Sequence, residues 1–284
     1  MNPLSPRHLW LGLLALLLPS FASCTMPLVG PVPQGVARER DLRFSPSPWP
    51  APLLADVYHP RDPLRPPAPA VLLIHGGSWK ADDDRWTMTP IAKALAKRGY
   101  VVVNAGYRGT PGFRYPAPID DLREAIHWMR RNATRYGIDP TRIAVFGYSA
   151  GGHLAAQVAL RDGNPEKLRA IVTASAPFDL SLFPDSEDVD AFLGAKVPDI
   201  PARVHEASPL SHVTSASPPI FIYQGTADTT VPPEHARRMQ AAYRRHGFDT
   251  QVFWLEGKGH IGAFLFPGTA MDAAIAFLDQ HLKQ

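Results

Sequence analysis

Short apolar segments alternate with amphipathic segments along most of the chain. Residues 70–74 (AVLLI) are apolar throughout, which is typical of a strand buried on both faces of a sheet. Residues 86–98 instead have helical spacing and are followed by Gly99, a residue type that commonly ends helices. Repeated strands and helices with short connections predict an α/β fold, with a mostly parallel sheet covered by helices on both faces. The same pattern predicts strands at 36–44, 53–58, 100–104, 143–146, 170–175, 220–223 and 251–255, and helices at 118–136, 150–160, 233–246 and 270–282.

One long stretch, residues 178–219, lacks this periodicity and is rich in Asp, Pro and Ser. It is too short for an independent domain, so we expect either a small cap over a site or a long connection. The chain shows no internal repeat, and its 284 residues, 45% of them apolar, are ample for one sizeable core. We therefore predict a single domain at residues 36–284.

The first residues have the pattern of a secretory signal peptide. Arg7 and His8 precede an apolar run at residues 9–18, which is too short to cross a bilayer as a helix. Small residues follow this run. We therefore predict a signal peptide at residues 1–23.

The end of this segment has a candidate lipid-attachment site. Residues 21–24, FASC, resemble the lipobox of bacterial lipoproteins, whose cysteine becomes the lipidated first residue, although the position of Phe21 usually holds leucine. Cys24 is the only cysteine in the chain, so it has no disulfide partner within it. We expect a lipid anchor on Cys24, a tether at residues 24–35 and a location at the membrane of a bacterial cell envelope. A secreted or periplasmic soluble protein and a cytoplasmic chain are the alternatives.

The charge pattern argues against nucleic acid as a partner. The formal net charge is +3, and the basic residues are scattered rather than gathered in a stripe. Arginine pairs at 130–131, 237–238 and 244–245 fall on predicted helices, where they are typical of a solvated face. Nothing in the sequence indicates an oligomeric state.

Residues 147–151, GYSAG, match the G-x-S-x-G pattern of a nucleophile elbow, between a predicted strand and a predicted helix. This pattern places a serine on a tight, strained turn, where glycines leave room that other side chains would fill. We predict Ser149 as a nucleophile at a helix N-terminus, where main-chain N–H groups stabilise negative charge. A glycine-rich turn without chemistry is the alternative. His153, four residues on, is expected to be structural.

Residues 75–79, HGGSW, directly follow a predicted buried strand. Ester hydrolysis passes through a tetrahedral oxyanion, which is stabilised by hydrogen-bond donors already aimed at it. Because glycines let the main chain turn its N–H groups inward, we assign this role to Gly77 and Ser78, with the N–H of Ala150 as a third donor. His75 is expected to brace the loop rather than act as a base. The alternative is a flexible glycine turn.

In enzymes with such an elbow, the triad follows the chain order serine, acid, histidine. Asp228 lies just after the predicted strand at 220–223 and is the expected acid, with Asp179, after the preceding strand, as its rival. His260 follows the last predicted strand in a glycine-rich loop without helical neighbours, and is the expected base. Three other histidines fall on predicted helices and are expected at the surface: His235, His246 and His281.

Together these motifs resemble the α/β-hydrolase carboxylesterases of the hormone-sensitive-lipase and feruloyl- and acetyl-esterase type. The resemblance covers residues 50–282 and rests on HGGSW and GYSAG together with GYR at 106–108, PA at 116–117, Asp120, YGIDPTRI at 136–143, GGH at 151–153, SP at 208–209, GTAD at 225–228, VP at 231–232 and GH at 259–260. It implies an α/β-hydrolase fold with at most a small cap. It also implies serine hydrolysis of short-chain or aryl esters through an acyl-enzyme. No His, Asp or Glu cluster in the sequence has metal-ligand spacing, so we expect no metal and no cofactor.

One departure from the resemblance concerns the acyl pocket. Ser78 stands where lipase-like members usually carry a third glycine, and its side chain is expected to narrow the pocket. Trp79, Tyr148 and Phe178 are candidates to line this pocket, and plain core packing is the alternative for each.

Two other functions stay open at this point. A serine peptidase of the prolyl-oligopeptidase type shares this catalytic domain, but this sequence has no N-terminal region of the size of the propeller that gates peptides. The second alternative is an inactive hydrolase that serves as a surface binding module. The complete triad argues against this alternative.

Overall fold

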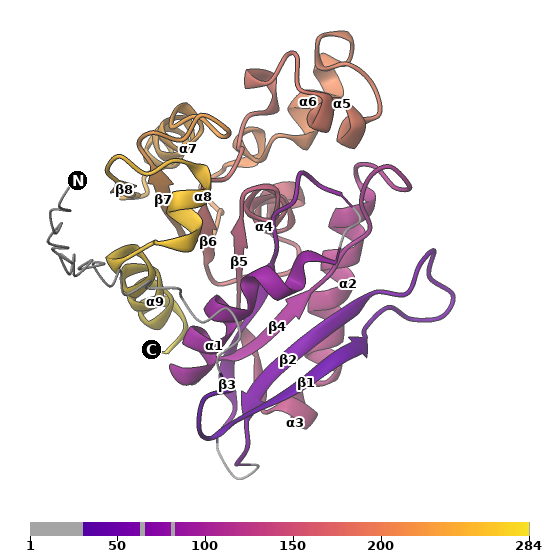
Figure 1. Cartoon of the computed structure of the whole chain (residues 1–284), viewed down its shortest axis with the longest axis vertical. Helices are drawn as coiled ribbons and strands as arrows, with labels where there is room; N and C mark the ends of the chain where they lie inside the picture. The colour runs from indigo at the N-terminus through magenta and orange to yellow at the C-terminus, as the bar shows by residue number, and fades with distance from the viewer. Residues whose placement is uncertain (1–30, 63–65, 81–82, 284) are drawn as a thin grey trace, which may run out of the picture.

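The computed structural model describes residues 31–62, 66–80 and 83–283, and its centre is an eight-stranded sheet (Figure 1). The strands are β1 (Val36–Arg43), β2 (Leu54–Pro60), β3 (Ala68–Ile74), β4 (Val101–Ala105), β5 (Ile138–Tyr148), β6 (Ile171–Ala174), β7 (Ile220–Gly225) and β8 (Val252–Leu255). They lie in the order β1-β2-β4-β3-β5-β6-β7-β8. β2 pairs antiparallel with β1 and β4, and all other pairs are parallel. The predicted mostly parallel α/β sheet is therefore confirmed.

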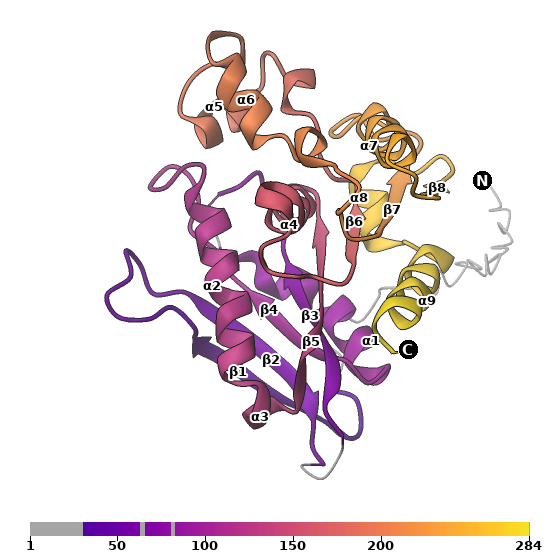
Figure 2. The same cartoon turned by 180° about the vertical axis from the view of Figure 1, so that it is seen from behind.

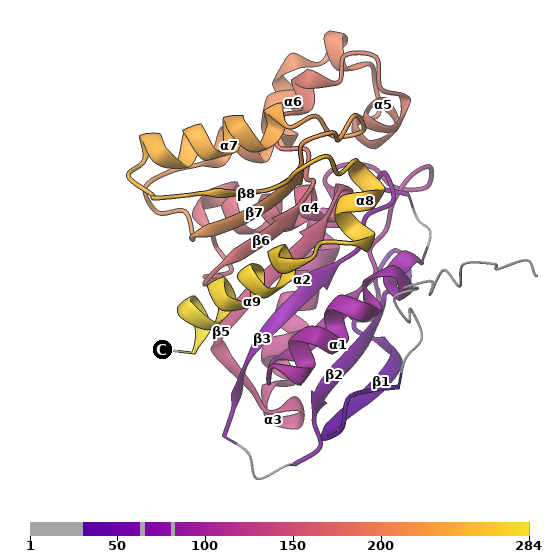
Figure 3. The same cartoon turned by 60° about the vertical axis from the view of Figure 1, so that its left-hand side comes forward.

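Helices cover both faces of the sheet (Figures 1 and 3). They include α1 (Thr89–Lys97), α2 (Ala117–Arg131), α3 (Ala133–Tyr136), α4 (Ala150–Leu160), α7 (Glu234–Arg245), α8 (His260–Leu265) and α9 (Thr269–Leu282). α1 and α9 pack on one face, which is turned toward the viewer in Figure 3, and α2, α4 and α7 pack on the other.

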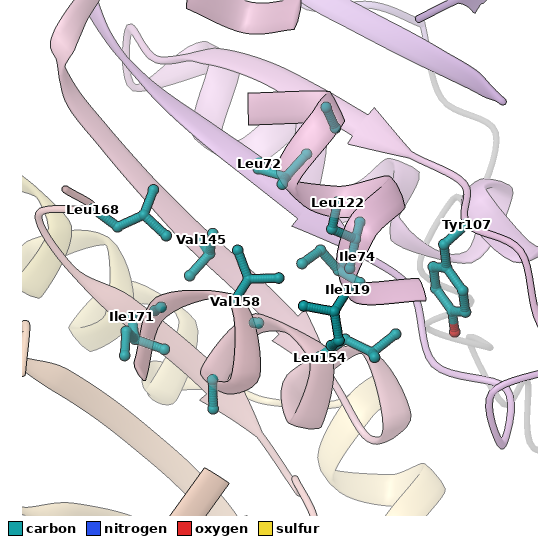
Figure 4. Packing of buried hydrophobic residues seen from close by; sticks show 14 of the residues in the cluster. Leu72, Ile74, Tyr107, Ile119, Leu122, Val145, Leu154, Val158, Leu168 and Ile171 are labelled. Carbon is teal, nitrogen blue, oxygen red and sulfur yellow. The ribbon is translucent and has the colours of Figure 1, made fainter. Parts of the chain in front are cut away.

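Two hydrophobic cores result, because successive side chains of a strand point to opposite faces of a sheet. In β3, Val71 belongs to the core under α1 and α9, whereas Leu72 and Ile74 belong to the core under α2 and α4. Figure 4 shows Leu72 and Ile74 near Leu122 of α2 and Leu154 of α4. Complete burial of one such side chain contributes about 1.5–3 kcal/mol, so these cores fix the strand ends that carry the site.

Two predicted helices have different bounds in the structure. The helix predicted at 86–98 is a 3-10 helix, Asp84–Met88, followed by α1, whose first turn contains Pro90. Proline lacks an N–H group and therefore favours the start of a helix over its middle. The helix predicted at 118–136 is interrupted at Asn132, where φ is −102° and the side-chain amide donates to a main-chain carbonyl one turn earlier.

Residues 178–219, the cap segment, form short helices at the carboxyl end of the sheet (Figures 1 and 2). The α-helices of this segment are α5 (Glu187–Leu193) and α6 (Pro201–Ala207), and 3-10 turns connect them. The Phe192 ring of α5 stacks on Trp79, in the loop after β3, with ring centroids 4.7 Å apart. Neither α5 nor α6 exceeds seven residues, which is too short for apolar periodicity to reveal.

Within the ranges that the structure describes, no helix has both the length and the apolar character needed to cross a membrane. The predicted signal peptide, Cys24 and most of the predicted tether lie outside the described residues. The lipid anchor therefore stays a prediction from sequence.

Candidate active site

Ser149 lies on a sharp turn between β5 and α4, with φ 54° and ψ −125°. Positive φ is uncommon for a residue other than glycine and costs about 1–3 kcal/mol. The turn is closely packed, since a Cβ added at Gly147 would lie 2.1 Å from the Gly151 oxygen, and one at Gly151 would lie 2.3 Å from the His75 oxygen. These two positions therefore require glycine, which gives the G-x-S-x-G pattern a steric cause.

The side chains of Ser149, Asp228 and His260 come together although they are far apart in the sequence. His260 Nε2 lies 2.9 Å from Ser149 Oγ, and His260 Nδ1 lies 2.8 Å from Asp228 Oδ2. With Nδ1 donating to the carboxylate, Nε2 is left to accept the serine hydroxyl proton. The structure thus joins the three predicted residues in the order nucleophile, base and acid.

The prediction that His260 lies in a loop without helical neighbours is wrong. His260 is the first residue of α8, and Gly259 before it is extended, with φ −81° and ψ −178°. α8 has only six residues and contains Gly262, so neither its length nor its composition signals a helix. The loop before it packs tightly on β7, where a Cβ added at Gly225 would lie 2.2 Å from the Lys258 oxygen.

Several donors hold the Asp228 carboxylate at the end of β7. Its Oδ1 accepts from the main-chain N–H groups of Thr230 (3.0 Å) and Val231 (2.8 Å), and its Oδ2 accepts from Gln224 Nε2 (3.1 Å). Burial raises the pKa of this carboxyl, but hydrogen bonds from His260 and Val231 outweigh burial and hold the pKa below its usual value. Asp228 therefore faces His260 as a carboxylate. Gln224 carries no sequence signal for this role.

Asp179, the alternative acid, has other partners. Its Oδ2 accepts from Arg238 at 2.7 Å, and its Oδ1 accepts from the Ser181 N–H at 3.1 Å. Burial raises the pKa of Asp179, but the hydrogen bonds from Ser181 and Arg238 lower the pKa below its usual value. This carboxylate anchors the start of the cap segment, and the His260 ring bonds to Asp228 instead.

The loop after β3 lies directly against the nucleophile. A Cβ added at Gly76 would lie 3.2 Å from the Ser149 Cβ, and the next two residues, Gly77 and Ser78, have φ 111° and 51°. In the described part of the chain, no main-chain oxygen accepts a hydrogen bond from the N–H groups of Gly77, Ser78 or Ala150. The Ala150 N–H opens α4, where the helix dipole favours negative charge. All three predicted donors are therefore available to an oxyanion.

His75 braces this loop, as expected. Its ring stacks on Tyr107 with centroids 4.5 Å apart, and its Nδ1 donates to the Gly76 oxygen at 2.7 Å. The Tyr107 hydroxyl donates to the His75 main-chain oxygen at 3.1 Å. Burial lowers the pKa of His75, which favours a neutral ring beneath the loop.

The three predicted pocket residues have different surroundings. The Tyr148 ring lies 5.1 Å from the His260 ring between centroids, and its hydroxyl donates to the His260 main-chain oxygen at 3.1 Å. Trp79 is 4% exposed, and its indole N–H donates to His153 Nδ1 at 3.1 Å. Phe178 has no exposed surface and belongs to the core. Tyr148 is thus the one of these three that contacts the triad.

The prediction that His235 lies at the surface is wrong. Its side chain is fully buried, and Nδ1 accepts from the N–H groups of Phe178 (3.2 Å) and Asp179 (3.3 Å). Burial lowers the pKa of His235 to about 4. The buried face of α7 includes His235, Met239 and Ala242, so helical spacing could have found this position.

Acidification is expected to destabilise the fold through two buried histidines, His153 and His235. Burial lowers the pKa of each from 6.5 to about 4, so between these pH values the unfolded chain binds protons that the folded chain does not. The free energy of unfolding should therefore fall by about 3 kcal/mol per histidine as the pH drops through this window, and level off below it. Urea unfolding at several pH values between neutral and acidic conditions measures this loss.

A matched pair of variants separates the contribution of the buried His235 ring to the pH dependence of stability. His246 is exposed and lies one residue past α7, so His246→Gln should leave the pH dependence of stability unchanged. His235→Gln should make the acid-induced loss smaller, because it removes one buried titrating group. The same pH dependence in both variants would contradict this explanation.

The described residues do not gather into a metal site, since among them no group of three or more His, Cys, Asp or Glu side chains could hold an ion. A serine, an imidazole and a carboxylate together supply a nucleophile and a route for its proton. The sheet order, the strained elbow and the arrangement of the three side chains are those of the α/β-hydrolase fold.

Comparison with known proteins identifies the family. Residues 55–243, which hold Ser149 and Asp228, match the BD-FAE family, and the chain therefore belongs to that family. It is similar to esterase LipC of Mycobacterium tuberculosis, with 32% identity over 237 residues that cover 73% of this chain and 56% of LipC. Esterase LipQ of the same organism is also 32% identical, over 64% of this chain and 47% of LipQ. The chain spans about half the length of the curated relatives that it matches.

Solved structures agree on the fold. The chain is similar to esterase Est2 of the Planctomycetes species Thermogutta terrifontis, with 25% identity and a TM-score of 0.71 over 87% of this chain and 92% of Est2. A truncated carbohydrate esterase from gut microbiota superposes with a TM-score of 0.78 at 23% identity, covering 87% of this chain and 97% of that structure. The resemblance to α/β-hydrolase carboxylesterases is therefore confirmed.

Proposed function

We propose that this chain is a serine carboxylic-ester hydrolase that works through an acyl-enzyme intermediate. The observation that carries the proposal is the continuous hydrogen-bond chain from Ser149 Oγ through the His260 ring to Asp228. His260 takes the hydroxyl proton as Oγ bonds to the ester carbonyl carbon, and gives it to the leaving oxygen as the C–O bond breaks. Water then attacks the acyl-enzyme in the same way, which releases the acid and restores the serine hydroxyl.

Charge develops at two places during each step. The N–H groups of Gly77, Ser78 and Ala150 would bind the oxyanion, and loss of one such donor costs about 3–4 kcal/mol in the barrier of comparable enzymes. The Asp228 carboxylate, ionised because its pKa is held low, stabilises the imidazolium that His260 becomes.

The substrates we propose are short-chain or aryl carboxylic esters. Relatives named as esterases support the ester bond. Est2 of Thermogutta terrifontis, at 25% identity, has been solved with propionate and with butyrate bound, which supports short acyl groups. Ser78, at the position of the usual third glycine, supports the same choice because its side chain takes up space beside the oxyanion donors.

A panel of 4-nitrophenyl esters tests this choice. We expect the highest kcat/KM for acetyl to butyryl esters and a steep fall toward palmitoyl, because long chains exceed a narrowed pocket. An aminoacyl 4-nitroanilide with a comparable leaving group tests the peptidase alternative and should be cleaved far more slowly. Preference for the palmitoyl ester would contradict the acyl size, and preference for the anilide would contradict the reaction class.

We also propose that Cys24 anchors the chain to the membrane of a bacterial cell envelope. The FASC sequence after an apolar segment and the single cysteine support this. Bacterial cells expressing the full chain should incorporate radiolabelled palmitate into it, and Cys24→Ser should abolish the incorporation. Label retained by Cys24→Ser, or wild-type protein without label, would contradict the anchor.

A further inference from the structure

Trp79, the residue after the oxyanion donor Ser78, is fixed on several sides by buried groups. Its indole N–H donates to His153 Nδ1 at 3.1 Å, and its ring stacks on Phe192 of the cap segment at 4.7 Å between centroids. Its main-chain oxygen accepts from the Thr110 N–H at 2.9 Å. These contacts hold Trp79 at φ 57°, a conformation that a tryptophan does not adopt without support.

His153 joins this tryptophan to the cap segment. It lies one helical turn after Ser149 in α4 and has no exposed surface. Because Nδ1 accepts from Trp79, the ring proton is assigned to Nε2, which donates to the Ala207 oxygen at the end of α6, 2.8 Å away. Burial lowers the pKa of His153 to about 4, so the ring is neutral and can accept on one side while it donates on the other.

We propose that His153 is a positioning residue for the oxyanion hole, acting through the indole of Trp79. Two successive non-glycine residues, Ser78 and Trp79, have positive φ, a conformation that is strained for both. Such strain persists only where surrounding contacts over-determine it. Without the bond to His153, the loop can relax toward ordinary φ values, which turns the N–H groups of Gly77 and Ser78 away from the nucleophile.

The inference rests on the proposed ester hydrolysis and deepens it, because it names a group that acts on the transition state without touching substrate. It also connects two residues of the cap segment, Phe192 and Ala207, to the loop that carries the oxyanion donors. Phe192 of α5 stacks on the Trp79 ring. The Ala207 carbonyl orients the His153 ring, which accepts the indole N–H of Trp79 on its other side. Two contacts of the cap segment, one with Trp79 and one with His153, thus support the loop that carries the donors.

Four single variants, and a double variant that combines His153→Leu with Trp79→Phe, test this role. His153→Leu removes both polar contacts, His153→Gln restores a side chain with one acceptor and one donor, and Trp79→Phe keeps a stacking ring but removes the indole N–H. The matched control is Gln157→Leu, because Gln157 lies one turn further along α4 and is fully buried. Its Nε2 donates to the Glu206 oxygen of the cap segment at 3.2 Å, whereas the Trp79 indole N–H donates to His153.

We expect His153→Leu and Trp79→Phe each to lower kcat by about 10- to 100-fold, with KM changed by less than about threefold. Affinity for an aryl trifluoromethyl ketone, which forms a tetrahedral oxyanion on Ser149, should fall by the same factor as kcat/KM. The double variant should be no worse than either single one, because both break the same hydrogen bond. His153→Gln should recover part of the loss, and Gln157→Leu should keep kcat.

Rates are normalised to active sites titrated to completion with a fluorophosphonate. Unchanged kcat in Trp79→Phe, additive losses in the double variant, or an equal loss in Gln157→Leu would overturn the positioning role. If His153→Leu does not fold, Trp79→Phe decides, because it keeps the His153 side chain and an aromatic ring facing Phe192. Wild-type protein that takes up no fluorophosphonate would overturn the proposed function itself, whereas labelled and active wild type with unaffected variants overturns only this inference.

Discussion

Replacing Ser149 with alanine should lower kcat/KM for a short-chain aryl ester by at least about 10³-fold. Alanine keeps the Cβ and removes only Oγ, the atom that lies 2.9 Å from His260 Nε2. The remaining rate would come from the oxyanion donors acting on water. Initial rates at ester concentrations well below KM measure the loss directly.

The control for Ser149→Ala is its unfolding temperature, which shows whether the variant still folds. Gly147 and Gly151, which allow the elbow, are unchanged, so the unfolding temperature should stay within a few degrees of wild type. A folded Ser149→Ala protein that keeps more than about one-tenth of the wild-type kcat/KM would contradict the assignment of the nucleophile.

Replacing Asp228 with asparagine should lower kcat by about 10³- to 10⁴-fold. The amide lacks the charge that stabilises imidazolium, and its NH₂ group favours the ring tautomer with the proton on Nε2, which cannot accept from Ser149. The amide oxygen can still accept from Thr230 and Val231, so the loop should keep its shape. Single-turnover acylation measured over a range of pH should show the loss in the chemical step.

Asp179→Asn is the matched control for this variant. Asp179 also follows a strand of the sheet, but its carboxylate bonds to Arg238 and Ser181. We expect its kcat to stay within about threefold of wild type. A large loss of kcat in Asp179→Asn together with a small loss in Asp228→Asn would show that Asp179, and not Asp228, is the acid of the triad.

Much of the fold could be predicted because the central strands are buried on both faces. β3, for example, is apolar from Ala68 to Ile74 apart from one proline, and all of it is buried. Short elements were harder, because six- or seven-residue helices such as α5 and α8 complete too few turns to show periodicity. β5 begins at Ile138, five residues before its predicted start, because its partly exposed first half lacks an apolar run.

The candidate triad could be predicted because its signals are local. Glycine is needed on both sides of Ser149 because the turn leaves no room for a Cβ there. Asp228 and His260 each follow a strand, in the expected chain order. The contact between Trp79 and His153 could not be predicted, since it joins residues 74 positions apart and depends on how the cap segment packs. The same holds for Gln224, whose amide bonds to Asp228 inside the core.

The measurement that tests the central claim most directly is the site of covalent labelling by a fluorophosphonate, mapped by mass spectrometry of the digested protein. A serine activated by His260 should carry the phosphonyl group, so the wild-type label should lie on the peptide that contains Ser149. Ser149→Ala should take up none. A label on a different serine, or an unlabelled wild-type protein that is folded, would show that the hydroxyl 2.9 Å from the His260 ring is not an activated nucleophile.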